Sequence, residues 1–131
     1  MKIEIVTPYQ HIATDDADEL YAVGPKGEFG ILPGHAHYVT PLLTGRLYYT
    51  NKSGKKTYLV TGGILEVFSD KVVVLADEVE RQDQIDAKQA QAELGRLDEK
   101  LAKESMDLET FAQALNHRRK EEVRVQVAAE K

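Results

Sequence analysis

Cysteine is absent from the 131 residues of this chain. Its absence excludes disulfide bonds, thiolate zinc sites and cysteine nucleophiles, so histidine and carboxylate side chains are the remaining metal ligands. Long apolar runs are lacking as well, since no stretch approaches the roughly 20 residues of a membrane-spanning helix. Met1 is not followed by the basic and apolar segments of a signal peptide. We therefore expect a soluble cytosolic chain without direct membrane insertion.

An excess of basic residues is also missing. The chain has 22 acidic and 17 basic residues, which gives a formal net charge of −5. A general nucleic-acid-binding protein would show the opposite balance. We therefore expect no nucleic-acid partner, and any function of basic side chains must be local.

Glycine and proline are nearly confined to the first part of the chain, because all four prolines and every glycine except Gly95 precede residue 85. This part alternates turn residues with short runs rich in β-branched and aromatic side chains, at 2–6, 46–50, 57–61, 64–68 and 71–76. Such spacing, without a helix between the runs, predicts seven or more short strands. We expect residues 1–84 to form an all-β domain, an antiparallel sandwich or a flattened barrel.

The composition changes at Ile85 to alanine, leucine, glutamate, lysine, glutamine and arginine, which favour helices. A first helix is predicted with Asp83 as its cap and with one apolar stripe formed by Ala90, Leu94, Leu97 and Leu101.

A second helix is predicted after a break at 103–107, capped by Ser105 or Asp107. Its apolar face would hold Leu108, Phe111, Ala112 and Leu115. Because the connection is short, the two helices should form an antiparallel hairpin over residues 85–131. The segment 117–127 ends in an alternating pattern that would also suit a strand.

The segment GEFGILPGHAHY, residues 27–38, contains the one pattern that suggests metal chemistry. In an extended segment, His35 and His37 would project from the same face, as paired metal ligands do. The pair resembles the His-x-His of cupins, but Pro41 and Leu42 stand where cupins place the glutamate ligand. A small metal-dependent enzyme is therefore one alternative, and Gly27, Gly30 and Gly34 are better explained as turn residues. No nucleophile, base and orienting group occur in a known order, so we expect no catalytic residues.

A basic cluster marks the second predicted helix, with Arg118, Arg119, Lys120 and Arg124. A solvated helix end would explain it, because cations suit the C-terminal end of the helix dipole. Docking to an acidic partner is the alternative.

Two motifs in fixed order give the chain a more specific resemblance. GEFGILPGHA (27–36) is followed by GGILEVFSDKVVVLADEVER (62–81) and then by the alanine-rich hairpin. This combination resembles the epsilon subunit of the F-type ATP synthase of bacteria and chloroplasts over essentially the whole chain. The resemblance implies a ten-stranded β-sandwich followed by a two-helix hairpin.

The resemblance also implies a non-catalytic rotor subunit that couples proton or sodium flow to ATP synthesis. Its sandwich would bind the gamma subunit and the ring of c subunits, with Glu28, Gly34 and His35 as contact residues. The complex would place it peripherally, on the cytoplasmic face of the inner or plasma membrane or on the stromal face of the thylakoid. The basic cluster, Arg118, Arg119, Lys120 and Arg124, would contact the catalytic alpha and beta subunits and inhibit ATP hydrolysis.

Some members of that family bind regulatory ATP at the hairpin through an Ile/Leu-Asp-x-x-Arg-Ala motif. The corresponding stretch here is IDAKQA, in which Asp86 and Ala90 match and Gln89 replaces the arginine. Glu80 and Arg96 would complete this possible ATP site, and no other cofactor is implied. A stand-alone β-sandwich binding module is the last alternative.

Overall fold

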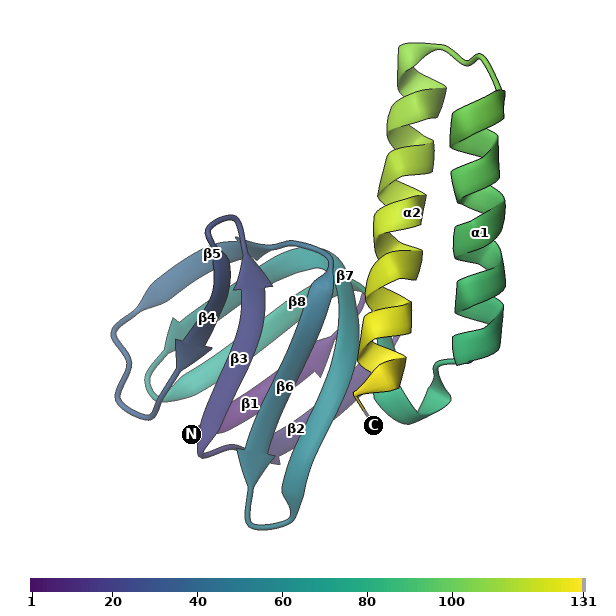
Figure 1. Cartoon of the computed structure of the whole chain (residues 1–131). Helices are drawn as coiled ribbons and strands as arrows, with labels where there is room; N and C mark the ends of the chain where they lie inside the picture. Colours follow the sequence, from purple (N-terminus) through teal and green to yellow (C-terminus); the bar gives the residue numbers. More distant parts are fainter. Residues whose placement is uncertain (131) are drawn as a thin grey trace. The chain divides into compact units, whose positions relative to one another are not determined.

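A computed structural model describes residues 1–130 of the chain. It contains two compact units that meet after Arg81, an all-β unit and a helical unit (Figure 1). The expected architecture of a β-sandwich followed by two helices is confirmed. The predicted boundary after residue 84 lies beyond a 3₁₀ turn, η1 (Gln82–Gln84), which the structure groups with the helices.

Eight strands make up the first unit of the described chain. They are β1 (Lys2–Val6), β2 (His11–Asp16), β3 (Glu19–Gly24), β4 (Gly27–Ile31), β5 (Tyr38–Leu42), β6 (Gly45–Asn51), β7 (Gly54–Phe68) and β8 (Lys71–Arg81). The resemblance implied ten strands. The difference arises because β7 and β8 are long and each contributes one half to either layer of the sandwich.

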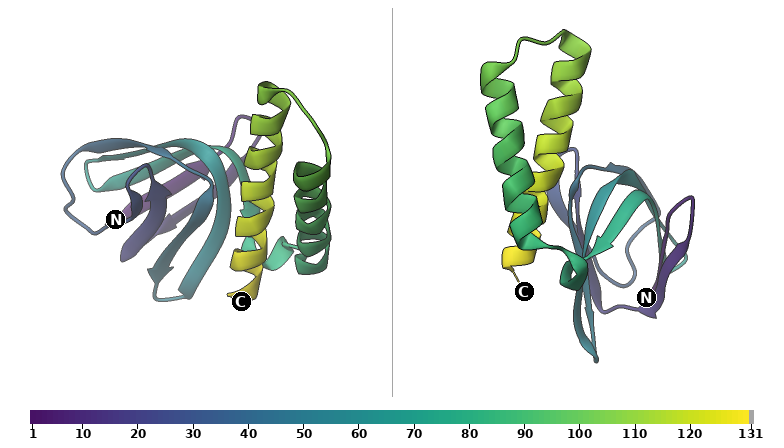
Figure 2. Two further views of the ribbon diagram at one scale, coloured as in Figure 1. Left: turned by 45° about the horizontal axis from the view of Figure 1, so that its top comes forward. Right: turned by 90° about the vertical axis from the view of Figure 1, so that its right-hand side faces the viewer.

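Strand β7 changes partners halfway along its length. Its first half pairs with β6, from Gly54 to Val60, and its second half pairs with β5, from Gly63 to Val67. Strand β8 follows β7 along nearly the whole hairpin and pairs with β1 through residues 71–75. One layer therefore runs β4-β3-β6-β7-β8, and the other runs β2-β1-β8-β7-β5. Figure 2 shows the curved β-sheet from two further sides.

The pairing of β1 with β8 is parallel, which differs from the predicted antiparallel sandwich or flattened barrel. The two strands are separated by most of the domain, so no tight turn forces them to run in opposite directions.

The core lies between the two layers. Alternate residues of the strands point inward, and the largest buried ones include Ile3, Ile5, Leu20, Leu47, Tyr49, Leu65, Val72 and Val74. The buried Tyr49 hydroxyl donates a 2.9 Å hydrogen bond to Asp15 Oδ2 at the rim. Lys56 Nζ lies 3.0 Å from the same oxygen. Hydrogen bonds from Lys56, the Asp16 backbone and Tyr49 lower the pKa of Asp15 to about 2. The buried Tyr49 hydroxyl thus has a hydrogen-bond partner.

Two glycines in the middle of β7 join segments that the sequence predicted as separate strands, 57–61 and 64–68. Gly62 and Gly63 both have positive φ, at 72° and 123°. A Cβ atom on Gly63 would lie 2.2 Å from the carbonyl oxygen of Leu75, on the paired strand. Glycine is required there because backbone touches backbone at the point where the hairpin crosses between layers.

The second unit consists of η1 and two helices, α1 (Ala87–Lys103) and α2 (Leu108–Ala129). Asp86 caps α1 by accepting the N–H of Gln89, so the prediction of Asp83 as the cap was wrong. Asp107, one of the two predicted candidates, caps α2 by accepting the N–H of Thr110. The helices lie side by side in every view (Figures 1 and 2).

The predicted apolar face is partly confirmed on α1 and wrong on α2. On α1, Ala90 and Leu97 are buried as expected. On α2, the predicted face is exposed, with Leu108 at 83% and Leu115 at 44%. The buried residues of α2 are instead Ala114, Glu121, Val123, Val127 and Ala128. The segment 117–127 is helical rather than extended, and its two buried valines, Val123 and Val127, lie four residues apart on one side of the helix.

We expect the Gly63→Ala substitution to destabilise the sandwich by about 2 kcal/mol or more, because a side chain at φ 123° meets the backbone of Leu75. Chemical denaturation measures this loss. Gly95→Ala is the matched control, since nothing lies within 4 Å of a Cβ atom there. That change in a helix should stabilise by about 0.5–1 kcal/mol. Equal effects of the two substitutions would contradict the assignment of Gly63.

Candidate functional site

The loop between β4 and β5 holds two of the predicted contact residues. Gly34 has φ 84° and donates its N–H to Asp70 Oδ1 at 3.1 Å. Asp70 lies in the β7–β8 turn and itself has a positive φ of 56°. The N–H of His35 donates to Leu32 O at 3.1 Å, which closes a turn. The two loops are therefore held together at one end of the sandwich.

Glu28 does not lie in this loop. It belongs to β4, and its carboxylate accepts a 3.1 Å hydrogen bond from Arg46 Nη2 on β6. Because β4 continues to Ile31, Glu28 lies within the strand and outside the loop that holds Gly34 and His35. The structure thus brings Gly34 and His35 together but leaves Glu28 on the outer surface of the sheet.

The two histidines of the metal hypothesis have different partners. His35 Nδ1 lies 2.7 Å from the carbonyl oxygen of Ala36, and its ring packs 5.7 Å from that of Tyr38. His37 Nε2 lies 3.2 Å from Glu66 Oε2. Among residues 1–130, no group of three or more histidine or carboxylate side chains suits a metal ion. The arrangement therefore favours a structured turn over a metal centre.

Four apolar residues form a row across the outer face of the second layer. Pro41 pairs with Ile64, Ile64 pairs with Leu75, and Leu75 pairs with Val6. Directly paired residues lie on the same face of a sheet. Ile64 is 48% exposed and Leu75 is 52% exposed, although their neighbours Leu65 and Val74 are completely buried. We call Val6, Pro41, Ile64 and Leu75 the apolar row.

The apolar row continues into an open groove of about 250 Å³. Its lining residues are Val6, Thr7, Pro8, Leu75, Ala76 and Asp77. A contiguous exposed apolar surface of this kind on a small domain is typical of a protein interface.

The basic cluster of α2 is engaged inside the helical unit. Arg118 contacts Asp98 Oδ1 on α1 at 2.5 Å and Glu122 Oε2 at 2.8 Å. These carboxylates raise the pKa of Arg118. Arg119 contacts Glu122 at 3.4 Å, and Lys120 is half-buried on the same helix. The basic cluster is therefore not a purely solvated helix end, because Arg118 and Arg119 pair with Asp98 and Glu122 of the same hairpin.

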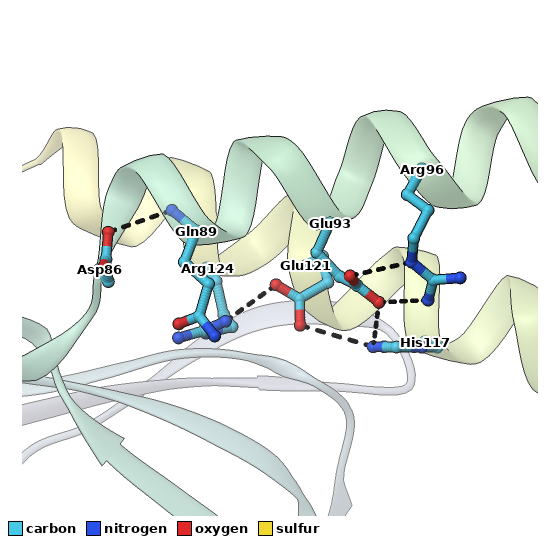
Figure 3. Close-up of polar contacts among 7 residues, drawn as sticks. All are labelled: Asp86, Gln89, Glu93, Arg96, His117, Glu121 and Arg124. Carbon is cyan, nitrogen blue, oxygen red and sulfur yellow. Dashed lines mark hydrogen bonds and ion pairs between the residues drawn. The ribbon is translucent and has the colours of Figure 1, made fainter.

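A second group of charges joins the two helices close by (Figure 3). Arg124 Nη1 donates to Glu121 Oε2 at 2.9 Å, and His117 Nε2 lies 3.6 Å from both Glu121 and Glu93. Glu93, on α1, also accepts two hydrogen bonds from Arg96. That pairing lowers the pKa of Glu93 and raises the pKa of Arg96. We call Glu93, Arg96, His117, Glu121 and Arg124 the hairpin ion-pair cluster.

The residues of the possible ATP site have structural roles within this unit. Asp86 caps α1, and Ala90 is completely buried. Arg96 is paired with Glu93, while Gln89 lies exposed on the first turn of the helix. Glu80 belongs to β8 of the sandwich unit.

Comparison with known proteins places the chain in a family. The model of the beta-sandwich domain of the ATP synthase delta/epsilon chain matches residues 1–82. The chain belongs to the ATP synthase delta/epsilon-chain family. The ATP synthase epsilon chain of Geotalea uraniireducens is 40% identical over 129 residues, which cover 98% of this chain and 94% of the relative. That of Geobacter sulfurreducens is 42% identical, with 98% and 93% covered.

Two solved structures share the fold of this chain. A chain of the Euglena gracilis mitochondrial ATP synthase, solved with OSCP, F1 and the c-ring, matches with a TM-score of 0.84 at 22% identity. The match covers 98% of this chain and 80% of that one. A chain from the central stalk and c-ring structure of the Tetrahymena thermophila enzyme matches with a TM-score of 0.70 at 17% identity, covering 97% and 95%.

Several residues of these sites escaped the sequence analysis. The apolar row depends on strand register, which no local pattern encodes. Asp70 was not predicted, because it lies in a turn 36 residues from Gly34 in the sequence. The hairpin ion-pair cluster left a signal, because His117, Glu121 and Arg124 are spaced by four and three residues. Along the described residues, the helices are too short or too polar to cross a membrane.

We expect Asp70→Gly to release the loop that contains Gly34. Glycine keeps the positive φ of this position but removes the acceptor, so amide exchange of Gly34 should quicken about 5- to 10-fold. Hydrogen exchange followed by NMR measures the rate. Asp70→Asn, which retains an acceptor oxygen and tolerates positive φ, is the control and should exchange as the unmodified chain does. Unchanged exchange in both variants would show that the loop does not depend on Asp70.

Proposed function

We propose that this chain is a rotor subunit of the central stalk of an F-type ATP synthase. It would carry out no catalytic step of its own. Its sandwich would help couple proton- or sodium-driven rotation of the ring to ATP synthesis, and its helical hairpin would inhibit ATP hydrolysis. The complex would hold it peripherally at the cytoplasmic face of the inner or plasma membrane, or at the stromal face of the thylakoid. Membership of the family and the epsilon-chain names of its relatives support this function.

The apolar row is the observation that carries the proposal. About half of each of the Ile64 and Leu75 side chains remains in water, although the adjacent Leu65 and Val74 are completely buried. Burial of a complete aliphatic side chain contributes about 1.5–3 kcal/mol, so covering the exposed halves would contribute roughly 1 kcal/mol each. An enzyme pocket would be more enclosed, whereas a flat row with an adjoining groove suits a protein partner. We assign this surface to the gamma subunit.

The loop with Gly34 and His35 is our proposed contact with the ring of c subunits. Its hydrogen bond to Asp70 supports this role, because a loop that is held in place loses less conformational entropy on binding. Glu28, from the outer surface of β4, would contribute a separate polar contact.

The pairing within the hairpin supports a regulatory role for the basic cluster, Arg118, Arg119, Lys120 and Arg124. Arg118 already pairs with Asp98 across the two helices. If the helices separated, the same guanidinium could pair with an acidic residue of a catalytic alpha or beta subunit. An exchange of one exposed ion pair for another changes the free energy by only about 0.2–1 kcal/mol. Two arrangements of similar free energy are what a switch needs.

We expect Ile64→Glu to weaken binding to the gamma subunit at least about 10-fold, since a carboxylate would be desolvated in the middle of the apolar row. Isothermal titration or co-purification with gamma measures the loss. Leu108→Glu, at a side chain that is 83% exposed on α2, is the matched control and should leave gamma binding unchanged. Normal binding by the Ile64 variant would reject the apolar row as the stalk surface.

We also expect a chain that ends at Gln84 to raise ATP hydrolysis by the reconstituted catalytic head. Loss of about 1 kcal/mol of inhibitory contacts corresponds to roughly a 5-fold increase in rate. The measurement compares hydrolysis with the full-length and the shortened chain.

Charge variants identify the source of that inhibition. Replacement of Arg118, Arg119 and Lys120 by glutamine should raise hydrolysis as truncation does. Replacement of Lys26, Lys52 and Lys55 in the sandwich removes the same charge and should not. Equal rates with full-length and shortened chains would leave the stalk role intact but would eliminate the inhibitory role of the hairpin.

A further inference from the structure

The carboxylate of Asp77 borders the apolar row on strand β8. Asp77 follows Leu75 by two residues, and both side chains line the same open groove. Gly62 on the paired strand has φ 72°, and a Cβ atom there would lie 2.6 Å from Asp77 Oδ2. The carboxylate therefore lies over the backbone of β7, at a position two residues before Ile64. Strands β1, β8 and β7, which carry this surface, are neighbours in the sheet (Figure 1).

Asp77 differs from the acids on the other side of the apolar row in having no partner. Glu66 Oε2 lies 3.2 Å from His37 Nε2, and Glu4 Oε2 lies 3.6 Å from Lys71 Nζ. Asp77 is exposed and forms no hydrogen bond or ion pair with any of residues 1–130. Of these three acids, Asp77 is therefore the one whose charge is available to another molecule.

The groove beside Asp77 combines apolar walls with this single charge. Its volume is about 250 Å³, and its walls include Val6, Pro8 and Leu75. The hydroxyl of Thr7, which also lines the groove, is engaged in hydrogen bonds within its own turn. Pockets for drug-sized ligands usually measure about 300–1,000 Å³, so this groove suits one large side chain rather than a small molecule.

The chemistry of the groove selects the kind of side chain that can enter it. A purely apolar side chain would cover the Asp77 carboxylate without compensating it, which is costly. An acidic side chain would be repelled. Lysine and arginine place an aliphatic stem along apolar surface and keep a cation at its end, which matches the walls and the carboxylate together.

We propose that the groove receives a lysine or arginine side chain of the gamma subunit, with its stem against Leu75 and Pro8 and its cation on the Asp77 carboxylate. The apolar row would supply contact area, which is not directional. The hydrogen-bonded ion pair at Asp77 is directional and would fix the position of the partner along the row. The inference rests on the proposed function in naming gamma as the partner.

The test measures binding of the purified cognate gamma subunit to the full-length chain by isothermal titration, at about 50 mM and about 500 mM salt. Asp77→Asn keeps the shape of the side chain and removes its charge. We expect binding at low salt to weaken about 10-fold, because the partner's cation loses its anion. At high salt the difference should shrink to less than about 3-fold, since salt screens a partly exposed ion pair.

Three further variants make the result specific. Asp18→Asn removes the same charge from an exposed turn between β2 and β3, and it should bind gamma as the unmodified chain does. Asp77→Glu retains the charge and should bind within about 3-fold of the unmodified chain. Asp77→Lys places two cations together and should weaken binding at least about 100-fold. Asp77 contacts no partner within residues 1–130, so thermal unfolding should show that its variants remain folded.

Equal binding by the unmodified chain and by Asp77→Asn would overturn the inference, and so would an equal loss in Asp77→Asn and Asp18→Asn. Either result would leave the apolar row and the stalk role standing, because gamma would still bind. Absence of gamma binding by the unmodified chain is a different outcome. It would reject the proposed function itself and, with it, the partner named for the groove.

Discussion

The antiparallel pairing of β7 with β8 is the interaction on which the sandwich depends. It runs from the pair Tyr58–Arg81 to the pair Phe68–Lys71 and crosses from one layer to the other. The crossing is possible because Gly63 lets the backbone of β7 lie against Leu75, where a side chain has no room. This hairpin sets the strand register of both layers, because β6 and β5 pair with β7 and β1 pairs with β8.

The proposed binding surfaces follow from that register. One residue of slippage would turn Ile64 and Leu75 into the core and expose Leu65 and Val74, because alternate residues face opposite sides. The apolar row is therefore a consequence of a buried interaction. The same hairpin ends in the turn that carries Asp70, whose carboxylate holds the loop of Gly34. The stability of the sandwich, the apolar row and the position of the Gly34 loop thus all depend on the β7–β8 hairpin.

The helical unit is stabilised differently. Its buried apolar residues are mostly alanine and valine, which bury little area. Two polar pairs connect α1 with α2, His117 with Glu93 and Arg118 with Asp98. Individual exposed ion pairs add little stability. They can also be exchanged for pairs with another molecule, which a large apolar core cannot do. The hairpin thus combines a weak core with charges that specify its closed arrangement, and Glu121 lies at the centre of those charges.

Periodicity and composition alone determined the division into a β-rich part and a helical part, the presence of two helices, and Asp107 as one candidate cap. These properties are local, so neighbouring residues encode them. Long-range pairing decided the rest: the parallel β1–β8 contact, the continuity of β7, the apolar row, and the link from Gly34 to Asp70. The apolar face of α2 was predicted wrongly because its leucines and phenylalanine have the right spacing, but spacing does not reveal which side of a helix meets a partner. Likewise, the sequence shows a basic cluster, and only the folded hairpin shows that its carboxylates are close enough to neutralise it.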